Sequence, residues 1–391
     1  MGELGSGPGA AAVGVVRPAH ERVRRAVASP CPAPLAPARE PLLFAELPAL
    51  RTLPFEPFAH LPTPVEPARA CAAYLGRDDV WMKRDDLVSP LYGGNKVRRY
   101  ELLLAAALAT GKRRVLTVGG TGSTQVTATA LFGRALGLGV RAVAFEQPLT
   151  RFVRRALCAN AAAGAELVPG GGYLGAFART VRELLRARDT AFVAPGASSP
   201  LANLGYVDAL FELDLQVRAG LLPRPDVIVL PTGSAGTLAG LLAGAWYLDW
   251  PLEIVGVAVA ARAACNRATV GLVAWRTRRL LARHAPGLGR RRHGPRFRLF
   301  HGALGPGYGH PTPDAVAALP EIERLTGAPG EVTYSAKALV GARSLCRDPR
   351  YRGKNVLLWN TLSSILPPAP ESARALLHPG FARCFDGELA V

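Results

Sequence analysis

The chain of 391 residues carries 47 Lys and Arg against 29 Asp and Glu, a net charge of +18, and is long enough for two domains. The charge raises the question of nucleic-acid binding, but no RNP, zinc-finger or basic-zipper pattern is present, which argues against that partner. No window of about 18 apolar residues predicts a membrane span. The six cysteines show neither a CxxC pair nor zinc-ligand spacing, so we expect reduced thiols, a cytoplasmic location and no metal site.

Residues 1–41 are rich in Ala, Pro, Gly and Arg and show no apolar periodicity. Such a segment cannot bury enough surface to offset its chain entropy, so the sequence predicts a disordered leader. From residue 42 onward, short apolar segments alternate with helical patterns, which predicts an α/β fold with a parallel-type sheet covered by helices. Strands are predicted at 80–83, 114–118, 141–145, 226–230, 253–259 and 356–359, and helices at 96–110, 123–136, 177–187 and 237–247.

An arginine-rich segment extends from residue 254 to residue 313. It contains eleven arginines and no carboxylate, and includes the run 290–292. Like charges in one block repel each other, so the composition predicts a solvated insert. A specific anion or nucleic-acid site is the alternative.

Only five residues are lysines, at 83, 96, 112, 337 and 354. Lys96 alone follows a double-glycine turn, Gly93-Gly94, that allows backbone at positive φ. Asn95 can cap a helix beginning at Lys96, which would place the amine at the positive end of the helix dipole. This setting favours a neutral, nucleophilic amine beside an anion site. An ordinary exposed helix lysine is the alternative interpretation of this motif alone.

A second motif joins the apolar segment 227–231 to a turn rich in Gly, Ser and Thr that opens a helix. The turn consists of Thr232, Gly233, Ser234, Ala235, Gly236 and Thr237. It has neither the Walker lysine nor the GxGxxG spacing of a dinucleotide site, so a phosphate monoester is the predicted ligand. A tight connection that binds no ligand is the alternative.

Taken together, these motifs resemble the aminocyclopropane-carboxylate deaminase and D-cysteine desulfhydrase family of pyridoxal-phosphate enzymes. The resemblance runs in family order from about residue 61 to residue 367. It rests on Lys83-Arg84-Asp85-Asp86-Leu87, Gly93-Gly94-Asn95-Lys96-Val97-Arg98, Gly119-Gly120-Thr121-Gly122-Ser123, residues 195–206, the turn 232–237 and Gly305-Pro306-Gly307-Tyr308-Gly309.

The resemblance implies a two-domain, tryptophan-synthase-β-like fold of type II. A small inserted domain (99–205) would face a large domain (42–98 with 206–391), and pyridoxal 5'-phosphate would lie between them. The substrate would be a small amino acid, and the protein a homodimer. Desulfhydration of D-cysteine to a 2-oxo acid and ammonia is the leading expectation. A β-replacement or other amino-acid-modifying activity, or a catalytically silent homologue, remains open.

The same resemblance implies a role for each matching residue. Lys96 would hold the cofactor as a Schiff base and move the substrate's α proton, and Ser123 and Tyr308 would line the substrate side. The cofactor-binding set would comprise Asn95, Lys96, Arg99, Thr124, Thr232, Gly233, Ser234, Ala235, Gly236, Thr237 and Thr361, with Arg99 and the turn at the phosphate and Thr361 near the pyridine nitrogen.

The sequence also departs from the family pattern around the expected cofactor. Thr124 and Gln125 stand where an Asn-His pair is usual, and Ala235 stands where a glycine is usual. Leu362 and Ser363 replace two glycines of a late motif. These changes predict an altered substrate or reaction, or weakened catalysis, rather than an altered fold.

Overall fold

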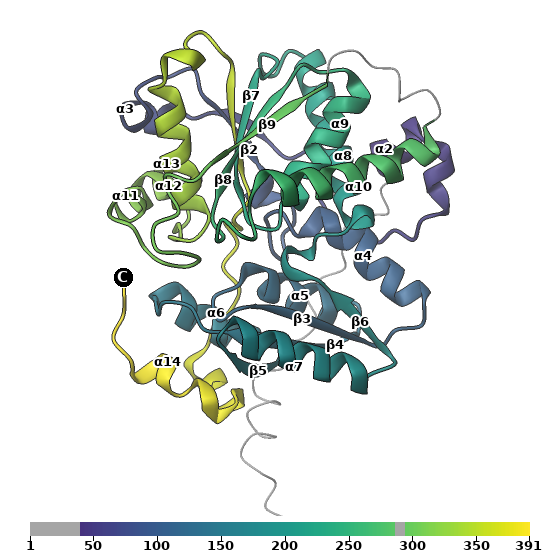
Figure 1. Cartoon of the computed structure of the whole chain (residues 1–391), viewed down its shortest axis with the longest axis vertical. Helices are drawn as coiled ribbons and strands as arrows, with labels where there is room; N and C mark the ends of the chain where they lie inside the picture. The colour runs from purple at the N-terminus through teal and green to yellow at the C-terminus, as the bar shows by residue number, and fades with distance from the viewer. Residues whose placement is uncertain (1–39, 286–293) are drawn as a thin grey trace, which may run out of the picture.

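The computed structural model describes residues 40–285 and 294–391, so the predicted leader lies, up to residue 39, outside the described residues (Figure 1). The larger of two sheets has six strands in the order β1-β2-β10-β7-β8-β9, and each neighbouring pair is parallel except β1 with β2. These strands are β1 (Val65–Pro67), β2 (Trp81–Arg84), β7 (Val227–Thr232), β8 (Glu253–Ala258), β9 (Arg296–Phe300) and β10 (Val356–Asn360).

Helices cover both faces of this sheet. Val227 and Val229 belong to the apolar cluster shared with α13, whereas Ile228 and Leu230 belong to the cluster shared with α8 and α9. This alternation is expected of a strand buried on both sides. One face carries α8 (Pro200–Arg218), α9 (Gly236–Leu248) and α10 (Arg267–His284), and the other carries α3 (Ala72–Leu75), α11 (Pro313–Ala317), α12 (Leu319–Thr326) and α13 (Ser335–Cys346).

The smaller sheet has four parallel strands in the order β5-β4-β3-β6. They are β3 (Arg114–Gly120), β4 (Gly139–Phe145), β5 (Glu166–Gly171) and β6 (Thr190–Val193). One face packs on α4 (Val97–Ala109), α5 (Thr124–Ala135) and α6 (Arg151–Ala162), and the other on α7 (Tyr173–Arg186). The remaining short elements are α2 (Leu42–Glu46) and the 3-10 turns η1 (Pro48–Thr52), η2 (Arg69–Cys71), η3 (Asp85–Leu87), η4 (Pro195–Ala197) and η6 (Pro349–Tyr351).

The predicted α/β class is confirmed, but the arginine-rich segment is not a solvated insert over most of its described length. Residues 267–284 form α10, which buries Val270, Thr277 and Leu281, and residues 296–300 form β9. The arginines project from a packed helix, and Arg278 lies 4.7 Å from the ring centroid of Trp246. The run 290–292 lies outside the described residues. Within the described ranges, no helix combines the length and apolarity that crossing a membrane requires.

The C-terminal segment returns to the smaller sheet. Its elements are η7 (Glu371–Leu376), η8 (Pro379–Phe381) and α14 (Arg383–Asp386). Phe381 and Ala373 pack into clusters formed with α6, and Arg154 Nε donates to the carbonyl of Cys384 at 2.9 Å. The domain boundaries stay a prediction, and these contacts favour moving the last residues from the large domain to the small one.

Candidate functional site

The first turns of α4, α5 and α9 meet where strands of both sheets end. Asn95 Nδ2, just before α4, donates to Thr237 Oγ1 of α9 at 3.1 Å. Tyr100 Oη, one turn into α4, donates to the carbonyl of Gln125 in α5 at 3.3 Å. Helix N-termini present free backbone N–H groups and the positive end of the helix dipole. Their convergence makes this part of the molecule suited to an anion.

Lys96 lies at the start of α4 and is buried. Its Nζ donates to Asn95 Oδ1. Burial, and secondarily the nearby charge of Arg99, lower the pKa of Lys96 well below 10.5. The Asn95 side chain therefore accepts a hydrogen bond from the Lys96 amine. The prediction that Asn95 caps α4 is wrong, since α4 has no side-chain N-cap hydrogen bond.

The turn before Lys96 is fitted closely to the end of β10. Gly94 has a φ of +87°, and a Cβ there would lie 2.5 Å from the carbonyl oxygen of Thr361. That oxygen also accepts from Asn95 N at 3.1 Å. Ser363 Oγ accepts from Gly93 N at 2.8 Å. Ser363, which replaces a family glycine, thus helps to hold the lysine turn.

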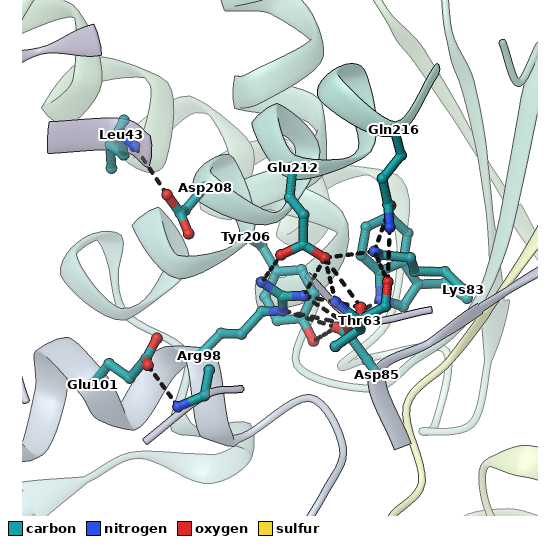
Figure 2. A network of polar contacts seen from close by, with 12 residues as sticks. Leu43, Thr63, Lys83, Asp85, Arg98, Glu101, Tyr206, Asp208, Glu212 and Gln216 are labelled. Atoms are coloured by element: carbon teal, nitrogen blue, oxygen red, sulfur yellow. Dashed lines mark hydrogen bonds and ion pairs between the residues drawn. The ribbon is translucent and has the colours of Figure 1, made fainter. Parts of the chain in front are cut away.

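A buried polar network anchors α4 through Arg98 (Figure 2). Arg98 Nη2 lies 2.9 Å from Asp85 Oδ1, and Arg98 Nη1 lies 3.0 Å from Glu212 Oε2. Lys83 Nζ lies 2.5 Å from Glu212 Oε1. Asp85 also accepts from Tyr206 Oη at 2.9 Å and from Trp359 Nε1 at 2.8 Å. The network therefore joins four elements, β2, α4, α8 and β10, and it does so through Arg98, two residues after Lys96.

The network contains two cations and two anions, so its formal charges balance. Burial by itself would raise the pKa of Glu212, but the charges of Arg98 and Lys83 outweigh it and lower this pKa to about 2. Burial lowers the pKa of Lys83, and Glu212 opposes that shift. Lys83 is thus committed to Glu212 rather than available for chemistry.

The turn between β7 and α9 has the geometry of a small cradle. Ala235 adopts a left-handed conformation with a φ of +63°, which glycine adopts more readily than any other residue. A Cβ added at Gly236 would lie 2.5 Å from Asn203 Oδ1, 2.7 Å from Ser198 Oγ and 3.0 Å from Arg99 Cζ. Only glycine leaves this space open.

Three buried polar atoms beside Gly236 have no hydrogen-bond partner among the described residues: Arg99 Nε, Ser198 Oγ and Asn203 Oδ1. Arg99 donates to Thr237 Oγ1 and to the carbonyl of Gly196, but no carboxylate lies within ion-pair distance of it in the described ranges. Burial lowers the pKa of Arg99 to about 10, so the side chain stays charged at neutral pH. Asn203 Oδ1 can only accept, but Arg99 Nε and Ser198 Oγ can donate, and an unpaired buried cation beside these two donors fits a phosphate monoester.

Replacing Arg99 with Met is expected to weaken binding of pyridoxal 5'-phosphate about tenfold to a hundredfold, because a charge-assisted hydrogen bond contributes roughly 1.5–3 kcal/mol. Binding of pyridoxal, which carries no phosphate, should change little. Equilibrium binding to cofactor-free protein, followed by absorbance, measures both affinities. Equal losses for the two ligands would place Arg99 away from the phosphate.

The predicted substrate side gathers around the end of β3. Ser123 caps α5 and accepts from Val126 N at 3.4 Å. A Cβ at Gly120 would lie 3.0 Å from Tyr308 Cε1, so Tyr308 reaches the same loop. Its Oη lies 3.0 Å from Tyr334 Oη. Burial, followed by the neighbouring Tyr334, raises the pKa of Tyr308 well above 10, so this phenol is protonated at neutral pH.

Lys337 holds the loop that carries Tyr308. Its Nζ donates to the carbonyls of Leu304 at 2.7 Å and Gly307 at 3.2 Å. Burial lowers the pKa of Lys337 to about 8. Sequence patterns assign no role to Lys337 or Tyr334, and they mark Ser198 and Asn203 only as members of the matching segment 195–206, because each comes to the site from a distant segment.

The two departures in α5 have different surroundings. Gln125 Nε2 donates to Thr117 Oγ1 at 2.6 Å and to the carbonyl of Ala194 at 3.0 Å, and its Oε1 accepts from Gly196 N. Gln125 therefore ties α5 to β3 and to η4. Thr124 is half-buried, and its hydroxyl makes no hydrogen bond in the described part of the chain.

Replacing Gln125 with His is expected to destabilise the protein by about 1–3 kcal/mol, because the imidazole cannot satisfy all of these buried groups. Replacing Thr124 with Asn should change the free energy of unfolding by less than about 0.5 kcal/mol. If the two substitutions together change activity, most of the change should come from Thr124→Asn. Urea denaturation and initial rates of the two single variants separate these effects. A stable Gln125→His variant with altered activity would contradict this division.

Comparisons with known proteins show which proteins this chain is similar to. The family model described as pyridoxal-phosphate dependent enzyme matches residues 57–361. A D-cysteine desulfhydrase of Yersinia pestis (strain Pestoides F) is 30% identical over 309 residues, covering 76% of this chain and 89% of that protein. The nocardicin C-9' epimerase of Nocardia uniformis subsp. tsuyamanensis is 36% identical over 214 residues, covering 53% of this chain and 64% of the relative.

Among solved structures, an ACC deaminase homologue superimposes with a TM-score of 0.67 at 26% identity, covering 87% of this chain and all of that one. Together with the family match, this likeness confirms the predicted tryptophan-synthase-β-like fold.

Proposed function

The chain belongs to the family of pyridoxal-phosphate-dependent enzymes, and on this premise we propose that it releases a 2-oxo acid and ammonia from a small amino acid, with D-cysteine as the leading substrate. The observation that carries this proposal is the buried amine of Lys96 at the start of α4, whose pKa is lowered well below its ordinary value by burial, beside the unpaired cation Arg99. D-cysteine is preferred to a cyclopropane amino acid because elimination of a thiol demands fewer specialised groups than ring opening.

Bound pyridoxal phosphate would supply an electron sink for the carbon next to the amino group. Lys96 Nζ would hold the cofactor and then accept the α proton, since the lowered pKa of Lys96 favours the neutral amine. Arg99, Ser198 and the N–H groups of the turn 232–237 would hold the phosphate. Ser123 and the first turn of α5 would orient the substrate carboxylate. The Tyr308–Tyr334 pair would donate a proton to the sulfur that leaves the substrate, and water would then release the 2-oxo acid and ammonia.

The test is product analysis with the purified full chain loaded with cofactor. D-cysteine, L-cysteine and 1-aminocyclopropane-1-carboxylate are supplied in turn, and 2-oxo acid, ammonia and sulfide are measured. Equimolar 2-oxo acid, ammonia and sulfide from D-cysteine support the proposal. Turnover of 1-aminocyclopropane-1-carboxylate alone would replace the leading substrate, and no 2-oxo acid from any of the three would overturn the lyase assignment.

Epimerisation of an amino acid is the second candidate, favoured by the 36% identity to the nocardicin epimerase. It shares removal of the α proton but returns a proton to the other face, for which the Tyr308–Tyr334 pair offers a donor. Incubation in deuterated water distinguishes the two reactions. Epimerisation gives an inverted, deuterated amino acid with no ammonia, whereas the lyase reaction releases ammonia.

A further inference from the structure

Aromatic side chains form a continuous row that runs outward from the candidate site. The ring centroids of Tyr334 and Tyr308 lie 5.9 Å apart, those of Tyr308 and Phe145 lie 5.8 Å apart, and those of Phe145 and Tyr173 lie 4.5 Å apart. Each distance falls within the roughly 4.5–7 Å at which aromatic rings attract one another. We name these four side chains the ring row.

The ring row crosses from the smaller half of the fold to the larger. Phe145 ends β4 and Tyr173 begins α7, so both belong to the smaller sheet and its helices. Tyr308 lies between β9 and α11, and Tyr334 directly precedes α13, so both belong to the larger sheet and its helices. The row therefore lies where the two halves meet, as the candidate site does.

The outer end of the row is uncovered. Tyr173 is 62% exposed, although a ring that only completed a core would be buried. Phe145, Tyr308 and Tyr334 are half-buried, so each of them keeps an accessible part. A single exposed tyrosine needs no explanation, but accessible rings in line beside a reaction site form an apolar binding surface.

The carboxylates next to the row are already engaged. Glu146, which follows Phe145 in the chain, forms an ion pair with Arg383. Glu331 is 4% exposed and accepts from the backbone N–H groups of residues 333–335 at the start of α13. The row thus offers ring faces, ring edges and phenol hydroxyls rather than charge, and it suits a neutral group.

The inner end of the row meets the reacting part of the substrate. In the proposed lyase reaction, the Tyr308–Tyr334 pair donates a proton to the leaving sulfur. Behind this pair, buried Glu331 and the first turn of α13 fill the space. A group attached to the sulfur and directed away from α13 would therefore meet Phe145 first and Tyr173 next.

We propose that the ring row is a subsite for an aromatic or bulky apolar group carried by the substrate. The inference rests on the proposed lyase reaction, in which this group is a substituent R on the sulfur, so the substrate class is S-substituted cysteines. D-cysteine is the smallest member of this class and leaves the ring row empty.

The reaction balances without an oxidant or a reductant. The Cα–H and Cβ–S bonds of the substrate break, the α proton goes to Lys96, and the electron pair of the Cβ–S bond leaves with the sulfur. The sulfur takes a proton from the tyrosine pair and departs as the thiol R–SH. One water molecule converts the remaining three carbons into a 2-oxo acid and ammonia.

The first test compares thiol release from S-benzyl-D-cysteine and S-methyl-D-cysteine by the full chain loaded with cofactor. The ratio of the two kcat/KM values, benzyl over methyl, is expected to be at least about ten, because the benzyl ring gains apolar contact on the row. Tyr173→Ala should lower this ratio about tenfold, whereas Tyr173→Phe keeps the ring and should keep the ratio.

The matched control is Leu185→Ala, an 82% exposed position near the other end of α7, which should leave the ratio unchanged. A ratio near one in the unmodified chain overturns the proposal and leaves the lyase reaction in place. A ratio that Tyr173→Ala does not lower has the same consequence.

Non-reacting analogues test the subsite without turnover. In D-2-amino-5-phenylpentanoate and D-norvaline, a methylene replaces the sulfur of the two substrates, so no thiol can leave. The Kd of each for the loaded chain is measured from the change in cofactor absorbance. The phenyl compound should bind at least about tenfold more tightly, and Tyr173→Ala should remove the difference.

The two measurements separate the subsite from the reaction. Tighter, Tyr173-dependent binding of the phenyl compound by a protein that releases no thiol supports the subsite, and it is then the lyase reaction that fails. Equal Kd values for the two analogues overturn the subsite even if thiol is released.

Discussion

Replacing Lys96 with Met is expected to reduce turnover by at least about a thousandfold, because the variant has no amine to hold the cofactor or to accept the α proton. The other lysines cannot substitute. Lys83 is paired with Glu212, Lys337 is bound to backbone carbonyls, and Lys112 donates to the carbonyl of Arg188 at 2.8 Å. Lys354 is exposed.

The same substitution has an opposite expected effect on stability. Burial disfavours the charged form of Lys96, as the lowered pKa indicates. The cofactor-free Lys96→Met variant should therefore melt at the same temperature as the unmodified chain or slightly higher. Calorimetry checks this sign, and Lys112→Met, at a partly exposed position, is the control for both rate and stability.

Borohydride reduction of the loaded enzyme followed by peptide mapping identifies the attached lysine directly. Label on Lys96 alone is the expected result. Label on any of the other four lysines would show that the assignment of Lys96 is wrong, even if the Lys96→Met variant is inactive.

Replacing Glu212 with Gln is expected to destabilise the protein by about 3–5 kcal/mol, because Lys83 and Arg98 would then share a single buried anion, Asp85. Urea denaturation measures the change. The control is Asp314→Asn, which removes a partly exposed ion pair with Arg343 and should cost less than about 1 kcal/mol.

A double substitution separates the missing charge from lost packing. Lys83→Met combined with Glu212→Gln restores the charge balance of the network, so it should cost less than Glu212→Gln alone. If the double variant is the less stable of the two, the network acts through its hydrogen bonds rather than through its balanced charges.

The pH dependence of stability provides a second measurement on Glu212. Its pKa is about 2 in the folded chain against an ordinary value of 4.5. A carboxylate with a depressed pKa contributes stability that is fully present above 4.5 and is lost as the pH falls from there toward 2. The contribution is on the order of 3 kcal/mol. The Glu212→Gln variant should lack this part of the loss of folding stability between pH 4.5 and pH 2.

The sequence by itself determined the features that are local. The glycine turn before Lys96 and the turn 232–237 were predicted because positive φ and helix starts depend on neighbouring residues. The alternation of strands and helices, and with it the α/β class, was readable for the same reason. Helix α8 was missed because it is buried on nearly every side and so shows no apolar periodicity, and α10 because its many arginines were taken for a solvated segment.

Only the tertiary structure decided which polar groups meet. Lys83 and Glu212 lie 129 positions apart, and Asp85 and Trp359 lie 274 apart, so no spacing rule pairs them. Gln125 departs from the family pattern, and the fold alone shows that its amide bonds to Thr117, Ala194 and Gly196. Arg99 was readable as a candidate, yet its lack of a carboxylate partner became visible only in the fold. Buried polar groups must find partners wherever the packed chain places them, and that placement is set by long-range contacts rather than by local sequence.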